Sequence, residues 1–189
     1  MITVIAGTNR EGSNTLKVAK AVAAMHRDLG AEVALVNLAE LPAAILSPGA
    51  YAEKPEGYEA AFQKPVLEAD GVVIVTPEYN GGFPGVLKLF IDMLPFPESF
   101  EKRPTAYVGL SAGASGALRP VEQLQMIFGY RNAFNFNRRV FMPGIGDLLD
   151  DAGAITDGDL RKRLQDQAKA FQEFVAALRP VSEGGGSNG

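Results

Sequence analysis

Short apolar runs alternate with longer amphipathic segments along this 189-residue chain. The apolar runs consist mainly of small and β-branched residues, which is typical of strands buried on both faces of a sheet. We expect five strands, at residues 2–6, 32–37, 71–76, 105–110 and 139–142.

The segments between these runs carry the helical period. Val18, Val22, Met25 and Leu29 recur at spacings of four, three and four, and Gly30 follows as the expected C-cap. Further helices are expected at residues 58–69, 85–94, 115–130 and 156–178, with Pro65 kinking or shortening the first of these four.

Strands that alternate with helices predict βαβ units, so the fold class is α/β, with a parallel sheet covered on both faces. We expect residues 1–180 to form a single domain and the Gly/Ser-rich residues 181–189 to form a disordered tail. The long connection 37–57, which contains Pro42, Pro48 and Pro55, is interpreted as a rim over a ligand.

The loop after the third expected strand is the most informative segment. Thr76-Pro77-Glu78-Tyr79-Asn80-Gly81-Gly82-Phe83-Pro84-Gly85 places two prolines and three glycines at the carboxyl end of a buried strand. Open α/β sheets bind ligands at this edge. The loop holds few groups suited to acid–base chemistry, which indicates a shaped binding surface.

The loop after the first strand has the composition of an anion site. Thr8, Ser13 and Thr15 supply hydroxyls and Arg10 supplies a charged donor beside a helix N-terminus, which binds phosphate through free amides. The alternative is that Ser13 or Asn14 merely caps the helix. The loop lacks both the P-loop and the dinucleotide glycine patterns, which favours one terminal phosphate, such as that of a mononucleotide.

The loop after the fourth strand contains a G-x-S-x-G sequence over residues 109–113, the pattern of a hydrolase nucleophile elbow. A serine nucleophile needs a base, and the only histidine, His26, lies upstream on the first helix. We therefore interpret Ser111 and Gly113 as a third small polar ligand loop. A phosphoacceptor receiver domain is disfavoured because no aspartate ends the third strand.

Composition narrows the function classes further. The net charge of −4 does not favour a nucleic-acid binder, and one histidine with no cysteine excludes thiolate chemistry and a multi-histidine metal site. We expect no metal, no signal peptide and no membrane span, and a cytoplasmic location.

Three motifs together resemble the NADPH-dependent FMN reductase family, which includes chromate, quinone and azo-dye reductases. They are Gly7-Thr8-x-Arg10-x-Gly12-Ser13-x-Thr15, then Pro77-Glu78-Tyr79-Asn80 with Pro84-Gly85-x-Leu87-Lys88, and then Ser111-x-Gly113-x-x-Gly116. The resemblance covers about residues 2–178, and its most specific part is the second motif. Leu89 departs from the family pattern, which often has asparagine there, and Thr15 also stands where asparagine is common.

The resemblance implies a flavodoxin-like three-layer sandwich with strand order 2-1-3-4-5, bound FMN, and a homodimer or homotetramer. It places Thr8, Arg10, Ser13 and Thr15 at the FMN phosphate, and we add Asn14 from the same loop. Pro77, Glu78, Tyr79, Asn80 and the adjacent Gly81 would line the flavin ring, with Ser111 and Gly113 flanking it.

The resemblance further implies an enzyme that passes a hydride from NADPH or NADH to FMN and then reduces a quinone, azo compound, metal oxyanion or flavin. No protein residue is expected to be catalytic, because the flavin carries the chemistry. The alternative hypothesis is a flavodoxin-like electron carrier that docks on protein partners.

Overall fold

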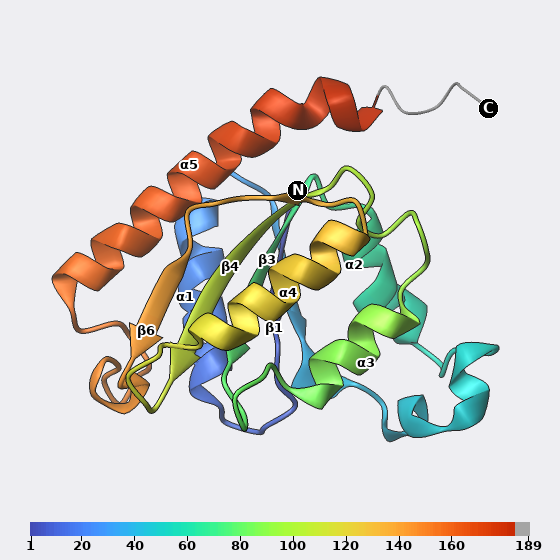
Figure 1. Cartoon of the computed structure of the whole chain (residues 1–189), viewed down its shortest axis with the longest axis horizontal. Coiled ribbons are helices and arrows are strands. Elements are labelled where there is room, and N and C mark those ends of the chain that lie inside the picture. Colours follow the sequence, from blue (N-terminus) through green and yellow to red (C-terminus); the bar gives the residue numbers. More distant parts are fainter. Residues whose placement is uncertain (184–189) are drawn as a thin grey trace.

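The computed structural model describes residues 1–183 and shows a parallel sheet between two layers of helices (Figure 1). Its strands run in the order β2-β1-β3-β4-β5, and β6 also pairs with β4. The predicted fold class and strand order are therefore confirmed. The strands are β1 (Ile2–Ala6), β2 (Val33–Asn37), β3 (Gly71–Pro77), β4 (Pro104–Ser111), β5 (Phe134–Asn135) and β6 (Val140–Pro143).

Two short strands share the fifth position of the sheet. The strand expected at 139–142 is β6, which pairs with the carboxyl half of β4, whereas the two-residue β5 pairs with the start of β4. The sequence analysis missed β5 because two residues carry no periodic pattern. Between β5 and β6 the chain moves away from β4, and at β6 it pairs with β4 again.

The helices are close to the predicted ones, with differences in three of them. The helix expected at 58–69 is a π-helical turn, η4 (Glu59–Gln63), followed by α2 (Lys64–Leu67), because Pro65 lacks an N–H. Helix α4 begins three residues later than expected, after Ala117 adopts a left-handed φ of 67°. The main helices are α1 (Asn14–Asp28), α3 (Gly85–Met93), α4 (Leu118–Tyr130) and α5 (Gly158–Glu183).

Helix α5 continues past residue 180, the expected end of the domain, through Glu183. Residues 184–189 of the expected tail lie outside the described residues. None of the helices within residues 1–183 combines the length and apolar character that crossing a membrane requires.

Side chains that alternate along the strands build one core on each face of the sheet. Val73 and Val75 of β3 belong to the core under α1 and α5, whereas Val72 and Ile74 belong to the core under α3 and α4. This two-faced burial explains why the strand sequences are continuously apolar. It also leaves the loops at the strand ends as the places for polar chemistry.

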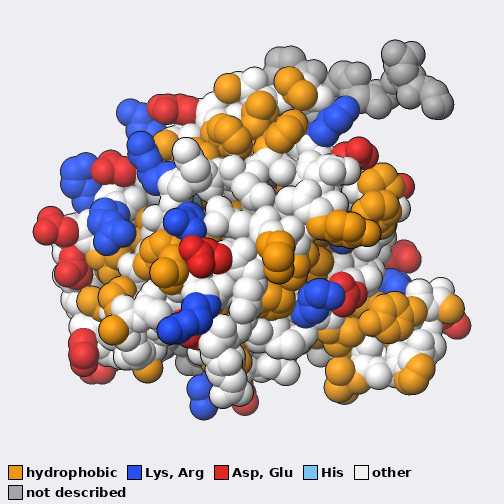
Figure 2. Space-filling model, in the orientation of Figure 1, with side chains coloured by type: hydrophobic (Ala, Val, Ile, Leu, Met, Phe, Trp, Pro, Cys, Tyr) orange, Lys and Arg blue, Asp and Glu red, His pale blue; other side chains and the backbone are white. Residues whose placement is uncertain are grey.

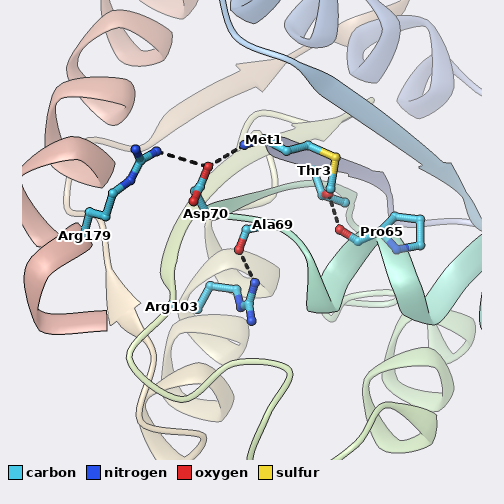
Figure 3. Close-up of polar contacts among 7 residues, drawn as sticks. All are labelled: Met1, Thr3, Pro65, Ala69, Asp70, Arg103 and Arg179. Atoms are coloured by element: carbon cyan, nitrogen blue, oxygen red, sulfur yellow. Dashed lines mark hydrogen bonds and ion pairs between the residues drawn. The ribbon is translucent and has the colours of Figure 1, made fainter. Parts of the chain in front are cut away.

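The amino edge of the sheet is held by polar contacts (Figure 3). The Asp70 carboxylate contacts the Met1 amino nitrogen and lies 3.3 Å from Arg179 of α5. Arg103 donates to the Ala69 carbonyl, and the Thr3 hydroxyl donates to the Pro65 carbonyl. These contacts join the starts of β1, β3 and β4 to α2 and α5, at the edge opposite the three polar loops.

His26 lies buried between α1 and α5. The Gln172 amide nitrogen lies 3.2 Å from its Nδ1, and the Phe171 ring meets it edge-on. Because an amide nitrogen only donates, Nδ1 acts as an acceptor and the ring is neutral. Burial lowers the pKa of His26 to about 4, from an ordinary value of 6.5.

We expect His26 to make the protein acid-sensitive. The unfolded chain takes up a proton on this ring below pH 6.5 and the folded chain does not until about pH 4, so stability falls as pH falls through this window. The loss amounts to about 2–3 kcal/mol by pH 4.5. Urea unfolding from pH 7.5 to 4.5 should show a smaller loss in His26→Leu than in the native chain. Parallel pH profiles for the two proteins would contradict this assignment.

Candidate functional site

Three polar loops meet at the carboxyl edge of the sheet, at the bottom of Figure 1. The register pairs Ala6 with Val75 and Pro77 with Leu110, so β1, β3 and β4 end at neighbouring positions. A cavity of about 420 Å³ lies between their loops. Of the predicted site residues, it is lined by Arg10, Ser13, Asn14, Thr15, Pro77, Glu78, Tyr79 and Ser111.

The other four predicted residues, Thr8, Asn80, Gly81 and Gly113, do not line this cavity. Thr8 is buried, and its hydroxyl lies 2.9 Å from the Tyr79 hydroxyl and accepts from the Arg10 amide at 3.3 Å. It therefore joins the first loop to the second from beneath the cavity.

The first loop presents a helix N-terminus and an arginine. Ser13 is the N-cap of α1, and its hydroxyl accepts from the Leu16 amide at 3.2 Å, so the capping interpretation is confirmed for Ser13. Asn14 and Thr15 follow as the first helical residues, whose amides have no acceptor within a helix. Arg10 is exposed, and its guanidinium contacts no acceptor or carboxylate among residues 1–183. The Ser13 cap therefore does not use the amides of Asn14 and Thr15 or the guanidinium of Arg10, and these three groups face the cavity.

The second loop is closed by a tight turn. Tyr79 and Gly82 exchange backbone hydrogen bonds of 2.8 and 3.0 Å. Asn80 has φ of 52° and Gly81 has φ of 78°, which are the angles of the type I′ turn favoured by Asn-Gly. The Glu78 amide donates to the Leu110 carbonyl at 3.2 Å. In the described chain, the loop amides from 78 to 82 that remain without a backbone acceptor are those of Asn80 and Gly81.

The Glu78 side chain holds the second loop against the third loop and α4. One carboxylate oxygen accepts from the Ser115 hydroxyl at 2.5 Å, and the other accepts from Arg119 at 2.8 Å. The hydrogen bond from Ser115 makes the largest contribution to lowering the pKa of Glu78. Arg119 lowers this pKa further, and desolvation by burial opposes both effects. Glu78 is therefore a fixed anion that braces the loop. The Gln123 amide supports the same turn by donating to the Gly81 carbonyl at 3.4 Å.

Packing explains the first glycine of the G-x-S-x-G sequence in the third loop. The Ser111 hydroxyl donates to the Gly113 carbonyl at 2.8 Å. A Cβ on Gly109 would lie 2.6 Å from the Gly116 carbonyl oxygen, so only glycine fits there. His26 lies about 18 Å further along α1 than its N-terminal residue Asn14, toward the opposite edge of the sheet. Ser111 and His26 therefore form no catalytic pair.

The sequence analysis missed five lining residues. Ile145 enters from η5 (Ile145–Asp147) because the Gly144 amide donates to the Gly113 carbonyl at 3.4 Å. The sequence could have indicated Ile145, since the loop after a fifth parallel strand must also lie at this edge. The others, neighbours of predicted residues, are Glu11, Gly12, Leu110 and Ala112.

Part of the connection 37–57 lies beside the second loop. It folds into three 3₁₀ turns, η1 (Leu38–Glu40), η2 (Ala43–Leu46) and η3 (Pro48–Tyr51). Leu38 and Leu46 face Tyr79 and the start of α3 across a second cavity.

The donor set of the polar cavity fits a cofactor that carries a phosphate and a flat ring, as FMN does. Free amides and Arg10 suit the phosphate, and Pro77 and Tyr79 of the second loop, with Ser111 and Ala112 of the third, border the space that a ring would take. A Cβ at Gly12 or Gly113 would meet no atom within 4 Å, so both glycines border open space. In the described part of the chain, no cluster of three or more His, Asp or Glu could hold a metal ion.

Comparisons with known proteins agree with this geometry. The family model described as NADPH-dependent FMN reductase matches residues 1–146. A quinone reductase from Escherichia coli is 30% identical over 94% of this chain and 96% of its own length. An NAD(P)H-dependent FMN reductase from Pseudomonas aeruginosa is 31% identical over 62% of this chain and 65% of its own length.

The solved structures confirm the fold. The flavoenzyme NAD(P)H:(acceptor) oxidoreductase FerB from Paracoccus denitrificans superposes with a TM-score of 0.78 at 23% identity. The match covers 94% of this chain and 97% of FerB. The family model spans all three polar loops, and the match to the E. coli relative extends over 94% of the chain. The chain therefore belongs to the NADPH-dependent FMN reductase family.

Proposed function

We propose that this protein is an FMN-dependent NAD(P)H oxidoreductase that reduces small-molecule acceptors, with quinones, azo compounds, metal oxyanions and free flavins as the candidate classes. The observation that carries the proposal is the polar cavity at the carboxyl edge of the sheet. It sets the N-terminus of α1 and Arg10 on one side, and Pro77 and Tyr79 of the second loop on the other. Family membership supports the same function.

Three loops would hold FMN. Arg10 and the amides of Asn14 and Thr15 suit the phosphate, because charged donors and free helix amides stabilise an anion. Pro77, Tyr79 and Ser111 would lie along the ring, and the free amides of Asn80 and Gly81 would donate to its polar edge. When bound, FMN supplies the hydride acceptor and donor that the side chains lack.

The protein itself would contribute binding, orientation and exclusion of water. The acidic side chains that line the cavity are Glu11 and Glu78. Glu78 is held ionised by Ser115 and Arg119, so it is unsuited to donate a proton. Protons for the acceptor would therefore come from solvent.

We further propose a homodimer or homotetramer and a cytoplasmic location. Met126 and Tyr130 of α4 are 72% and 79% exposed, and Phe96 after α3 is 62% exposed. Figure 2 shows apolar side chains on this face of the molecule. Large apolar side chains left in solvent mark an interaction surface. The location is supported by the proposed electron donor, since NAD(P)H is a cytoplasmic metabolite.

The purified protein should be yellow and should release FMN on denaturation. Mixing the oxidised holoprotein with NADPH or NADH in a stopped-flow spectrometer should bleach the flavin rapidly in a two-electron step. A colourless protein that does not rebind FMN would overturn the proposal. Slow reduction with a stable one-electron intermediate would instead support the electron-carrier alternative.

Replacing Arg10 should weaken FMN binding selectively. Arg10→Ala removes a charged donor from the phosphate, which costs about 1.5–3 kcal/mol of binding free energy. Isothermal titration of apoprotein with FMN and with riboflavin checks this, because riboflavin has no phosphate and its affinity should not change. Lys20→Ala, at an exposed position of α1, is the matched control. Equal FMN affinity in the native and Arg10→Ala proteins would place the phosphate elsewhere.

The Glu78 brace should act as a unit with Arg119. Glu78→Gln keeps the shape of the side chain but removes its charge, and we expect FMN affinity to fall about three- to tenfold. Arg119→Gln should give a similar fall, and the double variant should add little to either single variant. Glu122→Gln, on an exposed part of α4, serves as the control. Fully additive losses would show that Glu78 acts independently of Arg119.

A further inference from the structure

Two hydroxyl groups join the first loop of the polar cavity to the second. Thr8 is 1% exposed, and its Oγ1 lies 2.9 Å from the hydroxyl oxygen of Tyr79, which is 71 positions away in sequence. The Thr8 backbone is anchored, because its amide donates to the Ala6 carbonyl at 2.9 Å. The Tyr79 backbone is anchored by its two hydrogen bonds with Gly82. The contact between the hydroxyls is therefore a cross-link between two fixed points.

The stretch of the first loop between Thr8 and the N-cap Ser13 has little other support. Within residues 1–183, the backbone amides of residues 9–12 make a single hydrogen bond, from Arg10 to the Thr8 hydroxyl at 3.3 Å. The other three amides remain available to a ligand. The placement of this stretch therefore depends on the direction in which the Thr8 hydroxyl is held.

The hydrogen-bonding capacity of the Thr8 hydroxyl indicates what holds it. A threonine oxygen has two lone pairs and one proton, and one of these lone pairs accepts from the Arg10 amide. A phenol is more acidic than an aliphatic alcohol and is the better donor, so we assign the donor role in the second contact to Tyr79. With both lone pairs of its oxygen occupied, Thr8 cannot turn its hydroxyl without breaking one of the two bonds.

We propose that Tyr79 is a positioning residue for the FMN phosphate, acting through Thr8 and Arg10, and that its hydroxyl thereby strengthens the preference for FMN over riboflavin. The inference rests on the proposed function, which supplies FMN as the ligand. The Tyr79 ring lines the polar cavity, whereas its hydroxyl is committed to the first loop. Without that hydroxyl, residues 9–12 would have to be ordered when the phosphate binds, and this ordering lowers affinity.

Tyr79→Phe tests the proposal, because it keeps the aromatic ring and removes only the hydroxyl. In isothermal titration of the apoprotein, FMN affinity should fall about three- to tenfold, the usual effect of one hydrogen bond, and riboflavin affinity should stay within about twofold of the native value. Tyr51→Phe is the matched control, since Tyr51 is 59% exposed and lies outside the polar cavity. Equal losses for FMN and riboflavin would place the hydroxyl at the flavin ring and overturn the proposal. Unchanged FMN affinity would overturn it as well.

Variants of Thr8 test the path through this residue. Thr8→Val removes the acceptor of both bonds and should weaken FMN binding about as much as Tyr79→Phe does. The double variant should add little to either single variant, because the two hydroxyls act as one unit. Thr8→Ser keeps the hydroxyl and should bind FMN as the native protein does. Fully additive losses would contradict the proposed path.

A measurement without ligand separates this proposal from the proposed function. In the apoprotein, the Arg10 amide should exchange its hydrogen faster in Tyr79→Phe than in the native chain, while exchange in β1 and β3 should not change. Equal exchange at Arg10 in the two proteins would overturn the positioning proposal alone. A native protein that binds neither FMN nor riboflavin would contradict the proposed function, and the exchange rates would still decide whether the Tyr79 hydroxyl holds the first loop.

Discussion

The parallel pairing of β1, β3 and β4 is the constraint on which the site depends. The strands end at neighbouring positions, so the loops that follow begin side by side. Gly7 extends this pairing by donating from its amide to the Val75 carbonyl at 2.8 Å. A Cβ on Gly7 would lie 2.9 Å from that same oxygen, so the first loop leaves the sheet beside β3 only because residue 7 is glycine. The first loop and the second loop meet for this reason.

Much of the fold follows from local sequence patterns. The strand residues are apolar on both faces, and this marks β1 and β3 directly in the sequence. The loops could be assigned to one edge because parallel strands share their direction. Pro65 predicted an interruption of the helix expected at 58–69. The sequence did not predict that this interruption takes the form of a π-helical turn. The two residues of β5 follow no pattern, so only their pairing with β4 identifies them.

The site was predicted at the level of loops more accurately than at the level of side chains. Arg10 and Ser111 were expected in the lining and lie there. Glu78 was expected to line a ring largely through its backbone, and it lies in the lining while its carboxylate accepts a hydrogen bond from Arg119, 41 positions away in sequence. Thr8 was expected at a phosphate, and no sequence pattern indicated that its hydroxyl also lies 2.9 Å from the Tyr79 hydroxyl. Contacts between distant residues carry no local pattern, so the sequence analysis had no means of detecting these partners.

The second loop is anchored entirely by the chain's own contacts. Glu78 is held by α4, Tyr79 by the first loop, and the turn by its own pair of hydrogen bonds. Ordering a loop on binding consumes free energy that would otherwise appear as affinity. Here that entropic cost is met when the protein folds, so a ligand at this edge meets a preorganised surface. The second loop therefore adds no ordering cost to the binding of such a ligand.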